Sequence, residues 1–120
     1  MKEIRFGIIG CGLMGREFAS AAARWLHLSN PKAKPRIVAV CDTNPTLMDW
    51  FATHLGPIQT TTDYRDLLKN SEVDAIYCAV PHVLHAQMYP DILTAGKHLF
   101  GEKPFGMDLA QNRAIMAAIA

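Results

Sequence analysis

The chain has 120 residues, of which 50% are hydrophobic and 19% are charged, so it has the size and apolar content of one globular domain. Twelve Lys and Arg residues against eleven Asp and Glu residues leave a net charge of +1. That balance argues against a nucleic-acid-binding surface and against a polybasic membrane surface. No apolar run approaches the roughly 20 residues of a membrane span. We therefore expect no nucleic acid and no membrane as partner.

Three cysteines, Cys11, Cys41 and Cys78, form an odd set without the spacing of a metal site. They are typical of reduced, buried thiols in a cytoplasmic protein, and they argue against a disulfide scaffold. The first residues, Met1 to Arg5, lead directly into a strand pattern, so we expect no signal peptide.

The first half of the chain alternates strand and helix patterns. A polar, proline-marked segment from Asn30 to Pro35 predicts a loop before the second strand. Asp42, Thr43 and Asn44 are each suited to cap the second helix, which has Pro45 near its first turn. The expected elements are a strand over Ile4 to Ile9, a helix over Leu13 to Leu26, a strand over Ile37 to Cys41 and a helix that carries Leu47 to Leu55.

The second half continues the alternation. The expected elements are a strand around Ile58 to Thr60, a helix from about Asp63 to Lys69, a strand over Asp74 to Val80, a helix from about His82 to Ala95, a strand over Lys97 to Gly101 and a helix that begins at Asp108. Strands that alternate with helices in this way pair in parallel through right-handed crossovers. The predicted fold is α/β, a doubly wound parallel sheet of the Rossmann type with strand order 3-2-1-4-5.

The sequence ends at Ala120, inside an Ala-rich helix pattern without a C-terminal glycine or a polar tail. We therefore expect residues 1–120 to be a dinucleotide-binding domain that is truncated before a second domain.

A glycine-rich turn follows the first predicted strand. Gly10, Gly12 and Gly15 have the G-x-G-x-x-G spacing and stand between a strand and a helix, as in dinucleotide-binding folds. Gly10 suits the tight turn, Gly12 has no side chain to block a pyrophosphate, and Gly15 allows close helix–sheet packing. Leu13 and Met14 begin the helix, whose free N–H groups attract phosphate. The pattern predicts a dinucleotide site at these five residues; the alternative is a tight turn that binds nothing.

An acidic residue follows the second predicted strand. The carboxylate of Asp42 is suited to accept two hydrogen bonds from an adenosine ribose and to repel a 2′-phosphate, which favours NAD over NADP. Thr43, beside it in the expected cofactor site, has no positive charge for a 2′-phosphate, and Arg36 lies at the other end of the strand. Asp42 stands more than about 20 residues beyond Gly15, and the loop from Leu28 to Pro35 absorbs the excess. The alternative role of Asp42 is a helix cap.

The segment after the fourth predicted strand is expected to border the same cofactor, because ligands of open α/β sheets bind at the carboxyl ends of the strands. We expect Val80, Pro81, His82 and His85 to lie at the cofactor. A second interpretation of His85 is a hydrogen-bonded helix residue. His82 and His85 are spaced as two metal ligands would be, but no third ligand stands at a supporting spacing, so we expect no metal.

Glu102 and Lys103 follow the fifth predicted strand and reach the same edge of the sheet. Both are expected at the cofactor. Beside a nicotinamide, the ammonium of Lys103 is suited to bond a substrate hydroxyl and to stabilise the alkoxide that develops during hydride loss. The alternative is a surface Glu–Lys pair before a proline turn.

Together these segments resemble the glucose–fructose oxidoreductase/inositol dehydrogenase/rhizopine catabolism (Gfo/Idh/MocA) family. The resemblance covers essentially all 120 residues, and its most specific mark is Glu102-Lys103-Pro104; the other matching segments are Gly7 to Gly15, Ala39 to Asp42, Pro81 to His85 and Ala95 to Gly101. It implies an NAD(P)-dependent oxidoreductase that acts on sugars, inositols and related polyols. It also implies a second, larger α/β domain that binds much of the substrate and often mediates oligomers, so a homo-oligomer is expected of such a full-length protein.

The resemblance also implies roles for single residues. Lys103 matches the family's catalytic lysine, and Glu102 matches the acid that helps to define the same turn. Pro81 and His85 match a Thr-Pro-Asn-x-x-His pattern whose backbone borders the nicotinamide side. The family's further catalytic Asp and His come from the second domain. Residues 1–120 alone are therefore expected to bind nucleotide without a complete active site.

Two residues depart from that pattern: Val80 stands where threonine is common, and His82 where asparagine is common. Besides hydride transfer, we keep two alternatives: a non-catalytic NAD(H)-binding regulatory module, and another two-domain reductase that shares the Rossmann half. The Glu102-Lys103-Pro104 triplet favours the enzyme, since a sensor needs only the glycines and Asp42.

Overall fold

The computed structural model describes residues 1–119, so Ala120, where we expect the truncation, lies outside the described residues. Its strands are β1 (Lys2–Ile9), β2 (Ala33–Cys41), β3 (Gln59–Thr61), β4 (Ala75–Cys78) and β5 (His98–Gly101). They form one parallel sheet in the order β3-β2-β1-β4-β5. The predicted strand order and fold class are confirmed.

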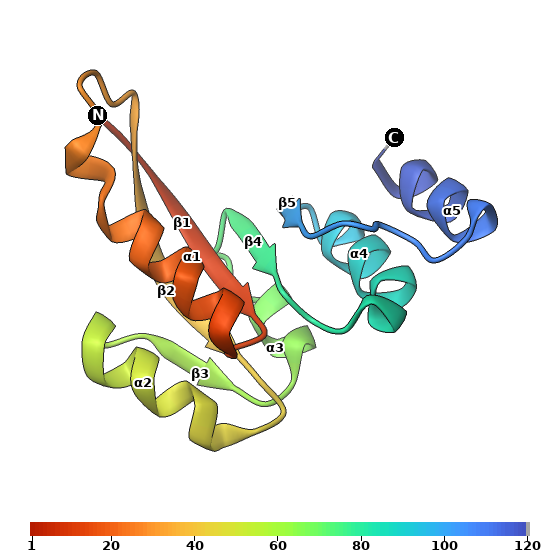
Figure 1. Ribbon diagram of the computed structural model, residues 1–120, viewed down its shortest axis with the longest axis horizontal. Helices are drawn as coiled ribbons and strands as arrows, with labels where there is room; N and C mark the ends of the chain where they lie inside the picture. The colour runs from red at the N-terminus through yellow and green to blue at the C-terminus, as the bar shows by residue number, and fades with distance from the viewer. Residues whose placement is uncertain (120) are drawn as a thin grey trace.

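Helices pack on both faces of this sheet. They are α1 (Leu13–Ala23), α2 (Pro45–Leu55), α3 (Tyr64–Leu68), α4 (His85–Thr94) and α5 (Leu109–Ile119), with two 3₁₀ turns, η1 (Trp25–His27) and η2 (His82–Leu84). Figure 1 shows α1 and α2 on one side of the sheet and α4 and α5 on the other. None of the helices within residues 1–119 combines the length and the apolar character that crossing a membrane requires.

Alternate residues of the strands supply two separate cores, as the period of two in a strand requires. Ile8, Val40 and Tyr77 pack with Ala19 of α1 and with Met48 and Phe51 of α2. Ile9, Cys41 and Cys78 pack with Leu67 of α3, Ile92 of α4 and Ile115 of α5. The sheet is therefore buried on both faces, which explains why its strands lack an apolar–polar alternation.

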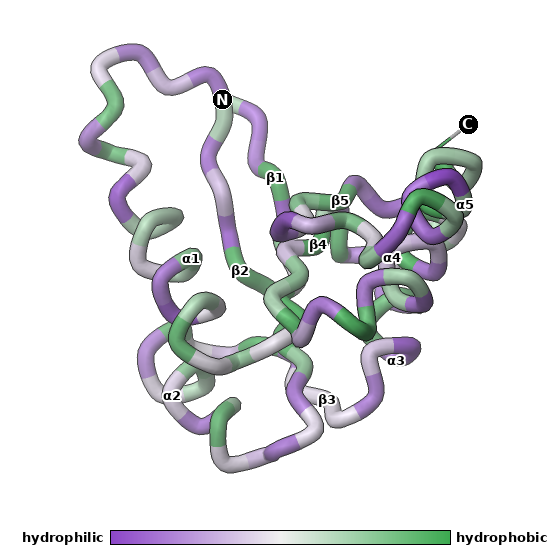
Figure 2. Tube along the Cα trace, turned by 45° about the vertical axis from the view of Figure 1, so that its right-hand side comes forward, coloured by the Kyte–Doolittle hydropathy of each residue, from purple (hydrophilic) through white to green (hydrophobic). Residues whose placement is uncertain are grey.

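The loop predicted over Asn30 to Pro35 is wrong from Ala33 onwards, because β2 begins there and includes Pro35. At this end β2 pairs with β1 alone, and β3 joins it only from Ala39. The outer edge of β2 at Pro35 therefore needs no N–H donor, and an edge position tolerates proline. Figure 2 shows hydrophilic colour at the amino-terminal ends of β1 and β2 and hydrophobic colour further along them.

Two predicted helices are shorter than expected. The first ends at Ala23 and gives way to η1, and the fourth begins as η2 before α4 starts at His85. Gly96, with a φ of +81°, follows α4 and confirms the predicted C-terminal glycine.

The register of the strands brings their carboxyl ends to one edge. Ile9 pairs with both Cys41 and Cys78, and Cys78 pairs with Gly101. The residues that follow these four are Gly10, Asp42, Ala79 and Glu102. Segments far apart in the sequence thus meet at the edge where open α/β sheets bind ligands.

Candidate functional site

The glycine-rich turn begins at a position where only glycine fits. Gly10 has a φ of +99°, and a Cβ there would stand 2.2 Å from the carbonyl oxygen of Ala79. Its N–H donates to the carbonyl oxygen of Cys41, 2.9 Å away. The turn is therefore wedged between the ends of β2 and β4, and its path leads straight to α1.

Gly12 and Gly15 differ in what surrounds them. A Cβ at Gly12 would meet nothing within 4 Å, so this position faces open space at the amino end of α1. A Cβ at Gly15 would stand 2.2 Å from the carbonyl oxygen of Gly10, so α1 approaches the turn more closely than a side chain permits. Since no side chain caps α1, its first N–H groups are available to an anion. These steric features match the predicted reasons for all three glycines; the cofactor contacts stay a prediction.

Asp42 lies half-buried directly after β2. Its Oδ2 accepts from the N–H of Cys11 and its Oδ1 from the N–H of Asn44, both at 2.8 Å. The cap of α2 is Asn44, whose side chain accepts from the N–H of Thr46 at 3.1 Å. Each carboxylate oxygen has a second lone pair, so Asp42 still has the capacity to accept from a ribose.

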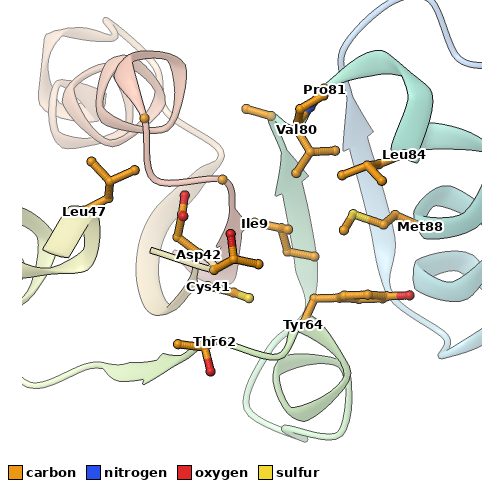
Figure 3. A pocket seen from close by; sticks show the side chains of 14 residues that line it. Ile9, Cys41, Asp42, Leu47, Thr62, Tyr64, Val80, Pro81, Leu84 and Met88 are labelled. Carbon is orange, nitrogen blue, oxygen red and sulfur yellow. The ribbon is translucent and has the colours of Figure 1, made fainter. Parts of the chain in front are cut away.

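A cleft of about 290 Å³ opens at this edge of the sheet. Figure 3 shows Asp42 and Leu47 on one side of it and, on the other, Leu84 at the end of η2 and Met88 of α4. The predicted site residues that line it are Gly10, Gly12, Asp42, Thr43, Val80 and Pro81. Its walls combine apolar side chains with one carboxylate, a combination that is typical of small-molecule sites.

Several lining residues were not predicted. They are Ile9, Cys41, Leu47, Thr62, Tyr64, Ala79, Leu84 and Met88. Leu84 and Met88 stand four residues apart, a spacing that places both on one side of a helical segment. That spacing, immediately after Pro81, was the available signal. Thr62 and Tyr64 follow β3, and no pattern in the sequence indicates that they line a cleft.

The other predicted residues lie outside this cleft. Leu13 and Met14 are exposed at the first turn of α1, and His82 is exposed on η2. His85 is completely buried, and its Nδ1 donates to the carbonyl oxygen of Pro104 at 2.6 Å. Its geometry is that of the second interpretation, a hydrogen-bonded helix residue. Gly15 is buried under the turn.

Glu102 and Lys103 follow β5 and are not among the residues that line the cleft. The hydroxyl of Tyr77, on β4, donates to Oε1 of Glu102 at 2.6 Å. Burial and the Glu102 carboxylate raise the pKa of Tyr77, so this hydroxyl stays protonated and keeps donating. Glu102 is therefore fixed through its carboxylate, whereas the side chain of Lys103 is exposed.

Three buried free thiols lie at or just after the carboxyl ends of β1, β2 and β4, and one of them, Cys41, lines the cleft. Burial, with the negative charge of Asp42, raises the pKa of both Cys11 and Cys41 to about 12. Burial raises the pKa of Cys78 to about 12 as well. These thiols are protonated at neutral pH and are poor nucleophiles. In the part of the chain that the structure describes, no three His, Cys, Asp or Glu side chains are placed to hold a metal ion.

The Gfo/Idh/MocA family, an oxidoreductase family with an NAD-binding Rossmann fold, matches residues 4–120. The chain belongs to this family. The resemblance carried by the glycine turn and by Glu102-Lys103-Pro104 is thereby confirmed.

Individual proteins are similar to this chain over nearly its whole length. The chain is 34% identical over 120 residues to the uncharacterized oxidoreductase YrbE of Bacillus subtilis, a match that covers 98% of this chain and 33% of that protein. A levoglucosan dehydrogenase in complex with NADH has the same fold, with a TM-score of 0.89 and 27% identity over 98% of this chain and 32% of the other. A 3-ketoreductase from Actinomadura kijaniata, KijD10, in complex with TDP-benzene and NADP, gives 0.80 and 29% identity, covering 98% and 35%.

The chain spans about a third of the length of these relatives. They include proteins with NADH and with NADP, so membership of the family leaves the choice between the two cofactors open.

Proposed function

We propose that the edge formed by the glycine turn, Asp42 and the start of α4 binds NAD(H). The observation that carries this proposal is the open space over Gly12 at the uncapped amino end of α1. There the backbone N–H groups and the partial positive charge of the helix end would hold the pyrophosphate. Asp42 would accept from the adenosine ribose, and the cleft wall at Leu84 and Met88 would contact the adenine.

Asp42 supports a preference for NAD over NADP. Both of its oxygens accept backbone N–H donors, so the carboxylate is held at the end of β2 where a 2′-phosphate would meet its negative charge. Thr43 beside it is neutral. Arg36, on the same strand, pairs with Glu3 at 3.4 Å near the amino ends of the strands.

The chemistry we propose is hydride transfer between the nicotinamide and a CH–OH carbon of a sugar, an inositol or a related polyol. When bound, the nicotinamide supplies the hydride acceptor or donor. This chain contributes an exposed ammonium, Lys103, at the carboxyl edge of β5. In the direction of reduction its ammonium would donate a hydrogen bond, and then its proton, to the substrate oxygen. In the direction of oxidation its neutral amine would accept the hydroxyl proton while the hydride leaves.

The remainder of the enzyme would come from outside residues 1–120. Because the chain spans a third of its relatives, we propose that a second domain completes the substrate site and takes part in any homo-oligomer. Residues 1–120 alone would then bind the nucleotide without turnover. The three buried free thiols support a reducing, cytoplasmic setting for this proposal.

A non-catalytic NAD(H)-binding module is the second candidate. The observation that favours it is that neither Glu102 nor Lys103 lines the cleft. A polyol and sugar panel assayed on the complete natural polypeptide separates the two candidates. Turnover supports the enzyme, whereas retained NADH binding without any turnover supports the module.

The test of the cofactor site is a calorimetric titration of the 120-residue chain with NADH and, separately, with NADPH, after circular dichroism shows that it is folded. We expect NADH to bind at least tenfold more tightly, a difference of about 1.4 kcal/mol. Equal affinities would remove the proposed role of Asp42 in choosing the cofactor. A folded chain that binds neither nucleotide would contradict the cofactor site in these residues.

A further inference from the structure

The loop after β5 is held by its neighbours on both sides of Lys103. Upstream, Glu102 is bonded through its carboxylate to Tyr77 and through its carbonyl oxygen to Tyr89. Downstream, Pro104 accepts a hydrogen bond from His85. Between these points, the Lys103 side chain makes no hydrogen bond or ion pair with any of residues 1–119. The loop thus fixes the backbone around Lys103 and leaves its ammonium to solvent.

Tyr89, on α4, is the upstream anchor of the backbone. It is completely buried, and its hydroxyl donates to the carbonyl oxygen of Glu102 at 2.8 Å. Its ring lies against Gly101, where a Cβ would stand 2.7 Å from the ring. The same ring packs edge to face with Phe105, with centroids 5.5 Å apart. One side chain therefore sets the position of β5's end and of the loop beyond Lys103.

His85, one helical turn before Tyr89, is the downstream anchor. Because a carbonyl oxygen only accepts, the Nδ1 that faces Pro104 carries a proton and donates to it at 2.6 Å. The rings of His85 and Tyr89 stack with centroids 4.3 Å apart, and Nε2 of His85 lies 3.2 Å from the Tyr89 hydroxyl oxygen. The two anchors are therefore in direct contact with each other on α4.

The targets of both anchors are carbonyl oxygens of the residues that flank Lys103. A carbonyl held on each side restricts the backbone dihedrals of the residue between them. The direction in which the Lys103 side chain leaves the loop therefore depends on α4, whose Met88 also lines the cleft. Helix α4 connects the position of the lysine to the position of the nucleotide.

We propose that His85 and Tyr89 are positioning residues for Lys103, which hold its backbone by paired hydrogen bonds to Glu102 and Pro104. This inference rests on the proposed function, because it assigns the pair a task in the step that Lys103 assists. It also gives His85 a role that needs no contact with the cofactor. Rates of reactions that depend on a positioned group fall steeply when that group is loosened.

The test uses Tyr89→Phe and His85→Leu, which remove one donor each and keep a side chain of similar size, and His85→Asn, whose amide nitrogen takes the place of Nδ1. In the complete natural polypeptide we expect kcat to fall at least tenfold in the first two variants, with KM for NADH within twofold of the parent. His85→Asn should recover more than half of the lost activity. A merely structural loss would not be restored in this way.

The matched control is Lys97→Met, at the opposite end of β5. It removes the hydrogen bonds from Nζ to the carbonyl oxygens of Asn70 and Val73, at 2.8 and 2.7 Å, and should lower the melting temperature without changing kcat. A fall in kcat in this variant equal to that in Tyr89→Phe would overturn the proposal, because lost stability would then explain both.

A second measurement does not need turnover. In the 120-residue chain, the ¹⁵N order parameter of the Lys103 amide should fall from about 0.85, the value of a rigid backbone, towards about 0.6 in Tyr89→Phe and His85→Leu. Unchanged order parameters in both variants would overturn the positioning role. The two proposals can fail separately. If the parent polypeptide shows no turnover but the order parameter falls in both variants, the proposed hydride transfer is contradicted while the anchoring of the Lys103 backbone is supported.

Discussion

The carboxylate of Asp42 accepts a hydrogen bond from the N–H of Cys11, 2.8 Å away, and so joins the end of β2 to the glycine-rich turn. Its other oxygen accepts from the N–H of Asn44, next to the start of α2. One side chain thus holds together the two loops between which the proposed ribose site lies. We expect its replacement to affect both the stability of this edge of the sheet and the choice of nucleotide. The two effects can be measured separately, as the free energy of unfolding and as the affinities for NADH and NADPH.

Asp42→Ala removes both acceptors and the negative charge. We expect the free energy of unfolding to fall by about 1–2 kcal/mol, mainly because the partly buried N–H of Cys11 loses its partner, whereas the N–H of Asn44 is exposed and can donate to water instead. We also expect NADH to bind about tenfold more weakly, while NADPH binding changes less. Calorimetry with both nucleotides measures this, and Asp42→Asn, which keeps one acceptor oxygen, is the control for the turn. An NADH to NADPH affinity ratio that stays at the parent value in Asp42→Ala would contradict the ribose role.

Two glycine variants separate folding from binding. Gly10→Ala requires a side chain at a φ of +99° and 2.2 Å from the carbonyl oxygen of Ala79, so we expect it to be strongly destabilised. Gly12→Ala meets nothing within 4 Å and has an extended backbone with a φ of −76°, so its melting temperature should stay at the parent value. We expect Gly12→Ala to weaken NADH binding at least tenfold, because its methyl group would occupy the space of the pyrophosphate. Parent-like NADH affinity in Gly12→Ala would show that no phosphate lies there.

The sequence alone predicted the strand order and the parts of the site that depend on local chemistry. The glycine spacing and the carboxylate after β2 can be interpreted from the local sequence, without knowing which elements pack together. Thr62, Tyr64, Leu84 and Met88 line the cleft because of how α3 and α4 lie over the sheet, and that placement follows from the whole core.

Two other features could not be predicted because they depend on neighbours in space. In the sequence alone, Pro35 is typical of a loop. A proline is acceptable at this point of β2 only because β3 is short and does not pair with that part of the strand. The anchoring of Glu102 and Pro104 by Tyr89 and His85 joins residues 13 and 19 positions apart. No local pattern carries that information.

At the amino-terminal edge of the sheet, Asp74 makes stability depend on acid pH. Hydrogen bonds from the side chain and the N–H of Arg5 lower the pKa of Asp74 to about 2, below the value of about 3.9 in an unfolded chain. The native state therefore gains from this carboxylate above pH 4, and the gain disappears as the pH falls from about 4 towards 2. Asp74→Asn should melt at a lower temperature than the parent at pH 7, and the difference should shrink towards pH 2. A constant difference across that range would contradict the assignment to Asp74.

The three cysteines should be unreactive while the chain is folded. Burial holds the pKa of Cys11, Cys41 and Cys78 at about 12, so almost no thiolate is present at pH 8. With an aromatic disulfide reagent at pH 8, we expect no rapid reaction in the native chain and release of three equivalents in guanidinium. A fast-reacting equivalent in the native chain would identify an accessible thiolate and would contradict the burial of these thiols.

Lys103→Ala tests the proposed chemistry directly. The side chain is exposed and makes no hydrogen bond or ion pair with residues 1–119. Its removal should therefore leave the melting temperature unchanged and the NADH affinity within twofold to threefold of the parent. If its ammonium donates to the substrate oxygen in the transition state, kcat of the complete natural polypeptide should fall about 100-fold or more. Lys32→Ala, an exposed lysine between η1 and β2, is the matched control and should keep full turnover. Turnover in Lys103→Ala equal to that in Lys32→Ala would contradict the proposed role of Lys103 in the reaction. It would also contradict the proposal that His85 and Tyr89 position this lysine for catalysis.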